Sequence, residues 1–552
     1  MAKHLQNIFV VSVSTLGSRV LGLVRDSLSY ALFGLAAINS AFIFAWSLPN
    51  LFRRLLGEGA LTSAFIPVLS EADHQEGRRE AFRFLNQVLT RLGMALYALV
   101  FLGMAAMAGL ELATMKAAQH APAALAELVK WHLDFGMSVE RFQELVTRWR
   151  LGFDFGLILM PYLLLVCLAA ALLAALNMLG RFAVSAMSQV WLNLAMIASL
   201  VSAALVFGRT PQEQMQQMYW QCAGVLIGGG LQVVIPAVQL WRQGWRPALD
   251  WTASARLSEM MRLFLPGLFG ASITQINILV SGCFALALNE SARTVLYASS
   301  RLMELPLGMF TIAVATVLFP KIAMMAAQGD REGMGRAYAQ GLRLIFAITV
   351  PAALGLLLLR EPVVSLLFER GQFDAQAVAA TTPVVALGAL GIPFFSLATL
   401  ATRGFHSLKD TRTPVRVAAW TFVVNLGLTL ALMAPMGTPG LALANLSSSI
   451  FQSLALQRLL LHRKTPLARP AVKRALKAIA IAGAGMALFT AAGWWALRAG
   501  LGGSKWVDFA AVAGLIPVSV LVYLGLLRAA KFEEWPQLEE LAMHALRPRQ
   551  KE

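Results

Sequence analysis

Apolar residues form long blocks along almost the whole chain, and short polar or charged stretches separate one block from the next. A helix that crosses a bilayer needs about 20 mostly apolar residues. Lipid offers no partner for backbone polar groups, so each block is expected to satisfy them within an α-helix. This criterion predicts fourteen spanning helices, which cover approximately residues 7–33, 38–64, 86–112, 152–176, 184–207, 219–241, 263–288, 295–320, 338–359, 380–402, 414–434, 440–461, 474–497 and 507–527.

Composition favours a membrane protein over a soluble one. The 552-residue chain is 58% hydrophobic and 14% charged, whereas soluble proteins average about 45–50% apolar and about 25% charged residues. In a soluble protein, the formal net charge of +17 would suggest nucleic-acid binding. In a membrane protein the positive-inside rule explains an excess of Lys and Arg, so no nucleic-acid partner is predicted.

The distribution of Lys and Arg predicts the orientation. With the N-terminus in the cytoplasm, most of them fall in cytoplasmic segments, including the densest run, Arg458–Lys477. This bias predicts that both termini are cytoplasmic. The first apolar block contains Arg19 and Arg25 and lacks a small-residue cleavage site, so we interpret it as a retained helix. The longest external segment, residues 113–150, has helical apolar spacing at Leu125–Trp149 and is predicted to lie on the outer surface.

Matching features in two parts of the chain indicate an internal repeat. The turn Asn177–Arg181 joins the fourth and fifth predicted helices, and His406–Asp410 joins the tenth and eleventh. Trp191 and Trp420 follow these turns at the same offset. Repeated bundles around a midplane site are typical of transporters. The predicted divisions are a first lobe over 1–241, a second lobe over 242–465, a final helix pair over 466–530 and a cytoplasmic tail over 531–552, which is predicted to form a short amphipathic helix.

Ionisable residues lie deep within the first predicted helix. If that helix begins near residue 7, Arg19 lies about 18 Å along it, near the bilayer centre. Ser18 and Arg25 share one face, and Arg19 and Asp26 share the adjoining face. A charge that faced lipid would cost at least about 2.5–3.5 kcal/mol, so this polar strip is predicted to face a cavity or protein. The alternative is an Arg–Asp pair that only locks helices together.

The second predicted helix carries Pro49, which can break a helix and free backbone groups toward a cavity. Arg53 and Arg54 follow, and successive side chains point about 100° apart, so the two cannot face the same lipid. A functional role is favoured for Arg53, which an apolar stretch and Glu58 follow. Arg54 has a simpler alternative as an anchor at the cytoplasmic surface.

The eighth predicted helix opens with Arg301 and Glu304, which lie three residues apart on one face. In a bundle of two halves, the first two helices would face the seventh and eighth, so Arg25, Arg53 and Arg301 are expected to converge. Three guanidinium groups repel one another unless an anion joins them, and Arg suits bidentate phosphate binding. These residues therefore predict a cationic cavity for a phosphate-bearing ligand.

Motifs for catalysis or cofactors are not found in the sequence. The seven His are scattered without HExxH or paired metal spacing, and no P-loop is present. The glycines at 228–230 and 333–335 do not follow predicted strands, and the three Cys lie in apolar blocks without a CxxC. The sequence therefore predicts a transporter rather than an enzyme, with no metal and no cofactor.

Several motifs resemble the MurJ/MviN lipid II flippase family, which belongs to the multidrug/oligosaccharidyl-lipid/polysaccharide exporter superfamily. They are Ser18–Asp26 (SRVLGLVRD), Phe33-Gly34, Leu48–Arg54 (LPNLFRR), Glu58–Ala60, Ala64–Pro67, Arg301–Gly308 (RLMELPLG), Leu367–Phe373 (LFERGQF) and Lys409–Pro414 (KDTRTP). The likeness spans nearly the whole chain. It implies two six-helix lobes that work by alternating access, followed by helices thirteen and fourteen, which form a groove for a lipid tail.

The resemblance also implies how individual residues act on lipid II, an undecaprenyl-pyrophosphate-linked disaccharide-pentapeptide. The residues implied to bind its pyrophosphate are Arg19, Arg25, Arg53, Arg54 and Arg301. The residues implied to support them or act in gating are Ser18, Asp26, Asn50, Glu58 and Glu304. Of these, Asp26 would orient Arg25. Ser40 and Ser47 stand where other members have an Asp and a Lys. The seventh predicted helix has no acidic residue, so the sodium site of some members is not carried over.

The function predicted from the sequence is therefore lipid II translocation in the bacterial cytoplasmic membrane by a monomeric, multi-pass protein. Its predicted partners are lipid II, membrane lipids and the cell-wall synthesis machinery. One alternative is an exporter of another polyprenyl-linked oligosaccharide or of a drug, although a drug antiporter should offer a carboxylate where this chain has arginines. A membrane enzyme acting on polyprenyl phosphates and a non-transporting scaffold are further alternatives.

Overall fold

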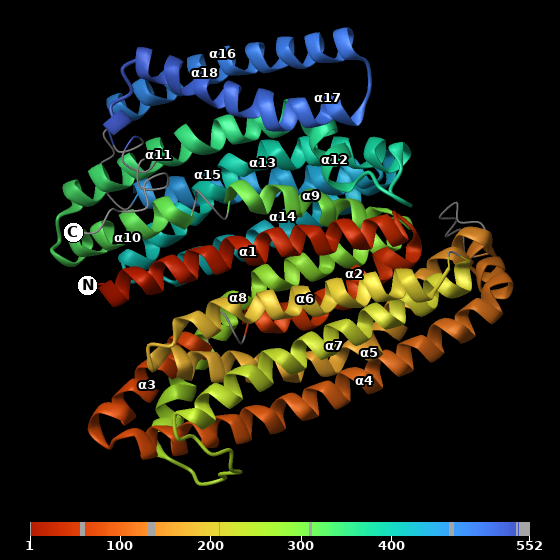
Figure 1. The fold of residues 1–552 in the computed structure, drawn as a ribbon, viewed down its shortest axis with the longest axis vertical. Coiled ribbons are helices and arrows are strands. Elements are labelled where there is room, and N and C mark those ends of the chain that lie inside the picture. The colour runs from red at the N-terminus through yellow and green to blue at the C-terminus, as the bar shows by residue number, and fades with distance from the viewer. Residues whose placement is uncertain are drawn as a thin grey trace. The chain divides into compact units, whose positions relative to one another are not determined.

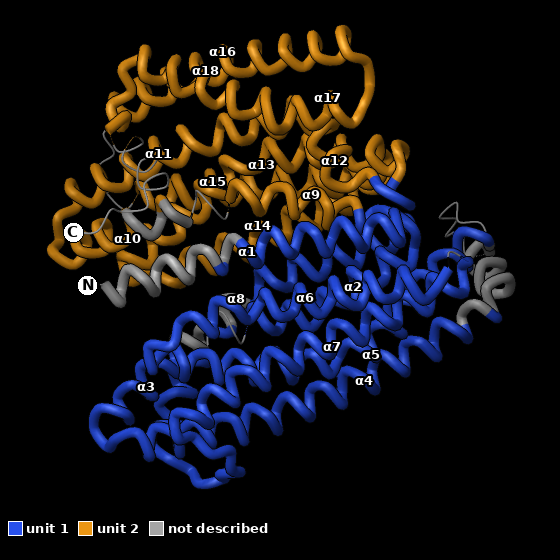
Figure 2. Tube along the Cα trace, viewed as in Figure 1, with its two compact units in different colours: residues 1–294, 370–373 blue, residues 295–369, 374–552 orange. Residues whose placement is uncertain are grey.

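The computed structural model describes residues 2–55, 61–130, 139–208, 210–307, 312–462, 469–536 and 539. In these ranges the chain is helical and no β-strand is formed beyond an isolated bridge between Arg370 and Phe373. The chain divides into two compact units (Figure 2), of which unit 1 comprises Met1–Thr294 and Arg370–Phe373 and unit 2 comprises Val295–Glu369 and Asp374–Glu552.

Unit 1 is a bundle of long helices (Figure 1). They are α1 (Ala2–Phe33), α2 (Ala37–Phe52), α3 (Leu61–Gln75), α4 (Arg78–Lys130), α5 (Val139–Met178), α6 (Phe182–Val206), α7 (Pro211–Arg242) and α8 (Ala255–Leu288). Helix α1 packs against α6, α2 against α5, and α4 against α5. One core cluster, contributed by α3, α4, α5, α7 and α8, includes the fully buried Phe65, Leu85 and Leu240.

Unit 2 contains most of α9 and all helices after it. They are α9 (Ala292–Pro306), α10 (Ile312–Ala327), α11 (Arg331–Leu358), α12 (Arg360–Phe368), α13 (Ala375–Ser407), α14 (Arg412–Met436), α15 (Thr438–His462), α16 (Arg469–Leu501), α17 (Lys505–Ala510), the π-helical η3 (Ala511–Leu515) and α18 (Ile516–Ala529). Helices α10, α11, α13, α14 and α15 share one core. Helices α16 and α18 pack on α11 around a second core that includes Tyr523 and Phe532.

Nine helices within the described ranges are long and apolar enough to cross a membrane. They are Arg78–Lys116, Glu140–Met178, Phe182–Val206, Pro211–Arg242, Arg331–Leu358, Ala375–Ser407, Arg412–Met436, Pro470–Leu501 and Lys505–Ala529. Large apolar side chains such as Tyr97, Phe101 and Leu488 are exposed on these helices. Such surfaces are expected where lipid is the solvent, so the chain is a multi-pass, helical membrane protein.

Two of the predicted spans are each built from two helices. The span predicted at 38–64 consists of α2, a π-helical turn over 53–55, and α3, while residues 56–60 lie outside the described ranges. The span predicted at 295–320 consists of α9 and α10, with residues 308–311 outside the described ranges. The expected break at Pro49 is wrong, because α2 continues through this residue to Phe52.

The predicted external segment at 113–150 is largely a continuation of its flanking helices. Helix α4 runs on to Lys130 and α5 already begins at Val139, while 131–138 lie outside the described residues. The sequence around 113–130 is rich in Ala, which favours helix. The prediction ended the first of these helices too early and began the second too late, because hydropathy marks the membrane boundary and not the end of the helix. The predicted amphipathic tail helix lies mostly in residues outside the described ranges.

The two turns on which the predicted repeat rests share a backbone conformation, but the ends of α7 and α10 have it too, so the repeat stays a prediction. At the end of α5, Gly180 has φ of 72°, and the N–H of Arg181 donates to the carbonyl of Leu176 at 2.9 Å. At the same offset after α13, Lys409 has φ of 57°, and the N–H of Asp410 donates to the carbonyl of Phe405 at 3.0 Å. Both helices thus end in the same left-handed motif, although the second turn uses a residue other than glycine.

The boundary between the two predicted lobes stays a prediction. Helix α8 belongs to unit 1, where it packs against α2, α3 and α5. The sequence division after residue 241 placed this helix in the second lobe. The two divisions rest on different criteria, since the units group residues by contact whereas the lobes follow the repeat in the sequence.

Candidate functional site

Arg25 is buried on α1, where it is 6% exposed, and its guanidinium has partners on two helices. Nε and Nη2 donate to Asp26 Oδ1 at 2.9 and 2.6 Å. Nη1 donates to Asn193 Oδ1 on α6 at 3.0 Å. The Asn193 amide donates in turn to the carbonyl of Ser18 at 2.9 Å. Asp26 therefore contacts Arg25, and Arg25 also ties α1 to α6.

Arg19 lies nearly two turns earlier on α1 and is half-buried. Its Nη1 atom is buried and has no hydrogen-bond partner among the residues that the structure describes. Leaving such a group without a partner costs free energy. Of the two deep arginines, Arg19 is therefore the one with an atom left to be satisfied by an added anion.

Arg53 and Arg54 lie in the π-helical turn that follows α2. Arg53 is half-buried, and its Nε donates to Asn50 Oδ1 at 3.2 Å. Asn50 is itself held by a hydrogen bond from its amide to the carbonyl of Trp46 at 3.1 Å. Arg54 is exposed. Asn50 thus positions Arg53, while Glu58 lies outside the described residues.

Arg301 lies on α9 in unit 2 and has the neighbour predicted from its spacing. Its Nη1 is 2.7 Å from Glu304 Oε2. Its Nη2 donates to the hydroxyl of Tyr297, and the guanidinium carbon lies 4.7 Å from the centre of the Tyr297 ring. Arg301 is 29% exposed and Glu304 49% exposed, so this pair is accessible to a ligand.

The candidate arginines are thus distributed over both units. Arg19, Arg25, Arg53 and Arg54 belong to unit 1, whereas Arg301 belongs to unit 2. The structure brings Arg25 together with Asp26, Arg53 with Asn50, and Arg301 with Glu304. Convergence of all the arginines on one ligand stays a prediction.

Asn193 and Tyr297 were not predicted from the sequence as site residues. Each is the hydrogen-bond partner of a candidate arginine. Tyr297 could have been found, because it lies four residues before Arg301 on the same helical face. Asn193 follows the repeated tryptophan Trp191, but its contact with α1 depends on tertiary packing that residue spacing does not reveal.

The two serines that depart from the family pattern have local partners. Ser40 is fully buried in unit 1, where its hydroxyl donates to the carbonyl of Glu290 and lies 2.9 Å from the hydroxyl of Thr294. The Ser47 hydroxyl donates to the carbonyl of Phe44 at 2.6 Å. Ser40 therefore connects α2 to the turn before α9, and as a neutral residue it adds no charge to the candidate site residues.

The LFERGQF motif is packed against the end of α1. The N–H of Gln372 donates to the carbonyl of Ala31 at 2.9 Å. Gly34 and Gly371 have φ of 54° and 59°, and a Cβ on either would collide with backbone of the opposite segment. Two glycines are required here because the two backbones touch, so this contact fixes the end of the helix that carries the deep arginines.

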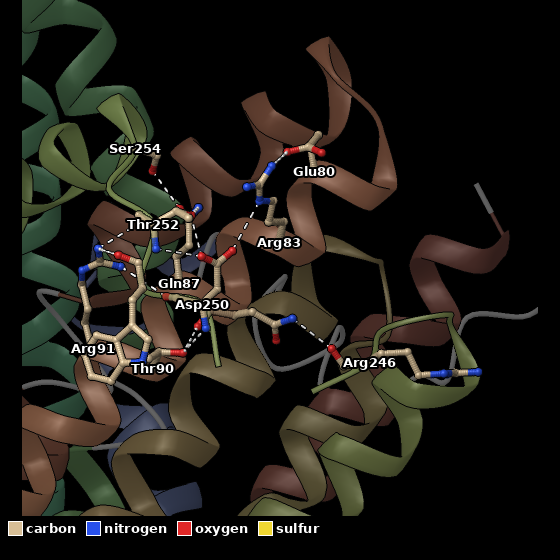
Figure 3. Close-up of polar contacts among 11 residues, drawn as sticks. Glu80, Arg83, Gln87, Thr90, Arg91, Arg246, Asp250, Thr252 and Ser254 are labelled. Atoms are coloured by element: carbon tan, nitrogen blue, oxygen red, sulfur yellow. Dashed lines mark hydrogen bonds and ion pairs between the residues drawn. The ribbon is translucent and has the colours of Figure 1, made fainter. Parts of the chain in front are cut away.

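A polar network fixes the connection between α7 and α8 to α4 (Figure 3). Asp250 Oδ1 accepts from the N–H and the hydroxyl of Thr252 at 2.9 and 2.5 Å, and Asp250 Oδ2 accepts from Arg83 at 3.3 Å. Arg91 donates to the carbonyls of Trp251 and Thr252 at 2.8 and 3.0 Å. These bonds hold the start of α8 on α4 and explain why α8 belongs to unit 1.

Comparison with known proteins identifies the family. The family model "Lipid II flippase MurJ" matches residues 30–502. A probable lipid II flippase MurJ of Bdellovibrio bacteriovorus is 30% identical, with 88% of this chain and 87% of the relative covered. The corresponding protein of Rhizobium meliloti is 31% identical, with 93% and 91% covered.

Solved structures agree on the fold. A structure described as "Lipid II flippase MurJ, inward closed conformation" matches with a TM-score of 0.71 at 23% identity, covering 94% of this chain and 98% of that one. An inward-facing MATE multidrug transporter matches with a TM-score of 0.59 at 13% identity, covering 84% and 99%. The chain belongs to the lipid II flippase MurJ family.

Proposed function

We propose that this protein is a lipid II flippase, which moves the lipid-linked peptidoglycan precursor from the inner to the outer leaflet of the bacterial cytoplasmic membrane. The observation that carries the proposal is the buried Nη1 atom of Arg19 in the apolar first helix, which has no partner in the described part of the chain. An anionic pyrophosphate would satisfy this atom, since Arg binds phosphate oxygens through charge-assisted hydrogen bonds. The family of the chain supports lipid II as the bearer of that pyrophosphate.

The arginines have two different roles, since Arg25 holds helix α1 in place and the others bind the pyrophosphate. Arg25 is engaged by Asp26 and Asn193, so it keeps α1, which carries Arg19, in place. Arg53, Arg54 and Arg301 contribute further guanidinium groups to the pyrophosphate. Binding the moving anion lowers the cost of carrying it through low-dielectric surroundings.

Translocation proceeds by alternating access of two six-helix lobes in a fourteen-span protein with both termini in the cytoplasm. The thirteenth and fourteenth spans are α16 and the α17–α18 segment, and they form the groove for the prenyl tail. The exposed apolar side chains of Trp495 and Leu521 on these helices support this role.

A membrane potential that is negative inside would favour outward movement of the anion by about 2.3 kcal/mol per charge per 100 mV. The chain acts as a monomer and as a transporter rather than an enzyme, and it supplies the cell-wall synthesis machinery with lipid II.

Complementation tests the proposal. A bacterial host depleted of its own lipid II flippase is transformed with the wild-type chain, with Arg19→Ala, or with Arg498→Ala. Arg498 is a matched control, because it is an exposed arginine of α16 that pairs with Glu361 at 2.8 Å. The wild type and the control should restore growth and outer-leaflet lipid II, whereas Arg19→Ala should not. Rescue by Arg19→Ala would contradict the role of Arg19. Failure of a correctly inserted wild type would favour the export of another polyprenyl-linked oligosaccharide or of a drug.

A further inference from the structure

A pocket in unit 2, separate from the residues discussed above, lies between α10, α11 and α16. Its volume is about 360 Å³, whereas a water molecule occupies about 30 Å³ of the liquid, so the pocket can hold a phosphate group with several waters. Its polar lining residues are Lys321, Gln340, Arg336, Arg343 and Glu533. Three cations thus face one carboxylate, and this balance favours an anionic ligand.

Helical spacing explains why these side chains meet. Arg336, Gln340 and Arg343 are separated by four and three residues, so they form one stripe along α11. Lys321 and Met325 form a corresponding stripe on α10. The two stripes face one pocket at the ends of both helices, where α10 finishes and α11 begins.

Arg343 forms a fixed part of the pocket. Its side chain is 12% exposed, and its Nε donates to Glu534, whose side chain is 4% exposed. This buried pair holds the guanidinium in one position. Its Nη atoms have no hydrogen-bond partner among the described residues, so they remain available to a ligand in a preorganised orientation.

The other charges of the pocket are accessible, and those that are paired form exposed pairs. Lys321 is exposed and has no ion pair with any described residue. Arg336 lies 3.5 Å from Glu332, but the two side chains are 66% and 78% exposed, and such surface pairs are weak. The single lining acid, Glu533, lies 3.0 Å from Arg474 in a pair that is also exposed, so one carboxylate is opposed by three lining cations. An arriving anion would therefore meet two accessible cations and one fixed guanidinium.

We propose that this pocket binds the phosphate of an anionic phospholipid from the surrounding leaflet. The spans of α11 and α16 begin beside it, at the level where lipid head groups lie, and basic pockets between spanning helices bind such head groups. Met325, Ala337 and Ala471 add apolar lining for the carbon atoms next to the phosphate. The site does not depend on the identity of the translocated lipid, and its bound phospholipid would hold α10, α11 and α16 together.

Thermal unfolding of the purified full-length chain in neutral detergent tests this site. We expect phosphatidylglycerol to raise the midpoint by about 2 °C or more, since a ligand that binds only the folded state stabilises it. Phosphatidylcholine and inorganic phosphate should produce little change. The double variant Lys321→Ala/Arg336→Ala should lose at least about two-thirds of the rise, because two of the three cations are gone, whereas Arg336→Lys should retain it.

The matched control is Arg331→Ala/Lys473→Ala, which removes the same charge from exposed residues at the same helix ends that do not line the pocket. This control should keep the full response to phosphatidylglycerol. An equal rise with inorganic phosphate would make free phosphate the ligand and overturn the lipid assignment. An unchanged rise in the pocket variant, or an equal loss in the control, would overturn the site itself.

Discussion

Asn193 of α6 bridges two points of α1, because it accepts from Arg25 Nη1 at 3.0 Å and donates to the carbonyl of Ser18 at 2.9 Å. The two contacts lie seven residues apart on α1, so one amide fixes both the rotation and the height of this helix against α6. Such a double contact holds the deep arginines in one place while Asp26 balances the charge of Arg25.

Replacing Asn193 should therefore destabilise the protein. In Asn193→Ala, Arg25 loses a charge-assisted hydrogen bond and buried groups lose their partner, at a cost of about 1–3 kcal/mol. Arg25→Ala should cost more, about 3–5 kcal/mol, because it leaves the carboxylate of Asp26 without its buried counter-charge. Thermal unfolding in detergent measures both. The Arg25 contacts would not be important for stability if both variants unfolded at the wild-type midpoint.

Arg19→Ala, in contrast to the Asn193 and Arg25 variants, should lose transport without losing stability. Since Nη1 of Arg19 is buried without a partner among the described residues, removing the side chain should leave the unfolding midpoint unchanged or slightly raised. Transport should nevertheless be lost, because the anion loses a ligand. Complementation and thermal unfolding of the same variant separate the two effects, and a large drop in stability would indicate a structural role instead.

Much of the fold follows from the apolar blocks, because each block that must bury its backbone in lipid forms a helix. The pairing of Arg25 with Asp26 was implied by the resemblance to the flippase family, whereas helical spacing alone placed Asp26 on the face of Arg19. Helix ends were harder to predict. Helix α4 continues to Lys130 because Ala-rich sequence remains helical beyond the end of the continuous apolar block.

Tertiary contacts limited the prediction of the site. The link from Arg25 to Asn193 joins residues far apart in sequence, and no spacing rule connects them. The π-helical turn at Arg53 was equally hidden, because the prediction had one span over 38–64 and considered a break only at Pro49, which lies within α2. Sequence could therefore identify the arginines but not the backbone that presents them.

Substitution of Gly371 should show how much the contact with the end of α1 matters. Gly371→Ala places a Cβ against the backbone of Ala31 and forces a left-handed conformation at φ of 59°, which alone costs about 1–2 kcal/mol. We expect a lower unfolding midpoint and weaker complementation. Gly427→Ala is the control, because this glycine lies within α14 and has nothing within 4 Å of an added Cβ. It should be neutral or stabilising by up to about 1 kcal/mol, and equal loss in both variants would contradict the close-contact explanation.

The network around Asp250 should make stability depend on pH. Hydrogen bonds from the hydroxyl and N–H of Thr252, helped by Arg83, hold the pKa of Asp250 below its usual range. A carboxyl with a lowered pKa in the folded state adds stability above the unfolded value of about 3.9 and loses that contribution as pH falls through the folded value. Asp250→Asn should therefore destabilise the protein at pH 7 by about 0.5–1 kcal/mol, given partial solvation, and should flatten the decline of the unfolding midpoint as the pH falls below about 4. Thr252→Val removes the hydroxyl but keeps the backbone N–H, so its unfolding midpoint should lie between those of the wild type and Asp250→Asn. Parallel pH profiles for Asp250→Asn and the wild type would show that another group controls acid stability.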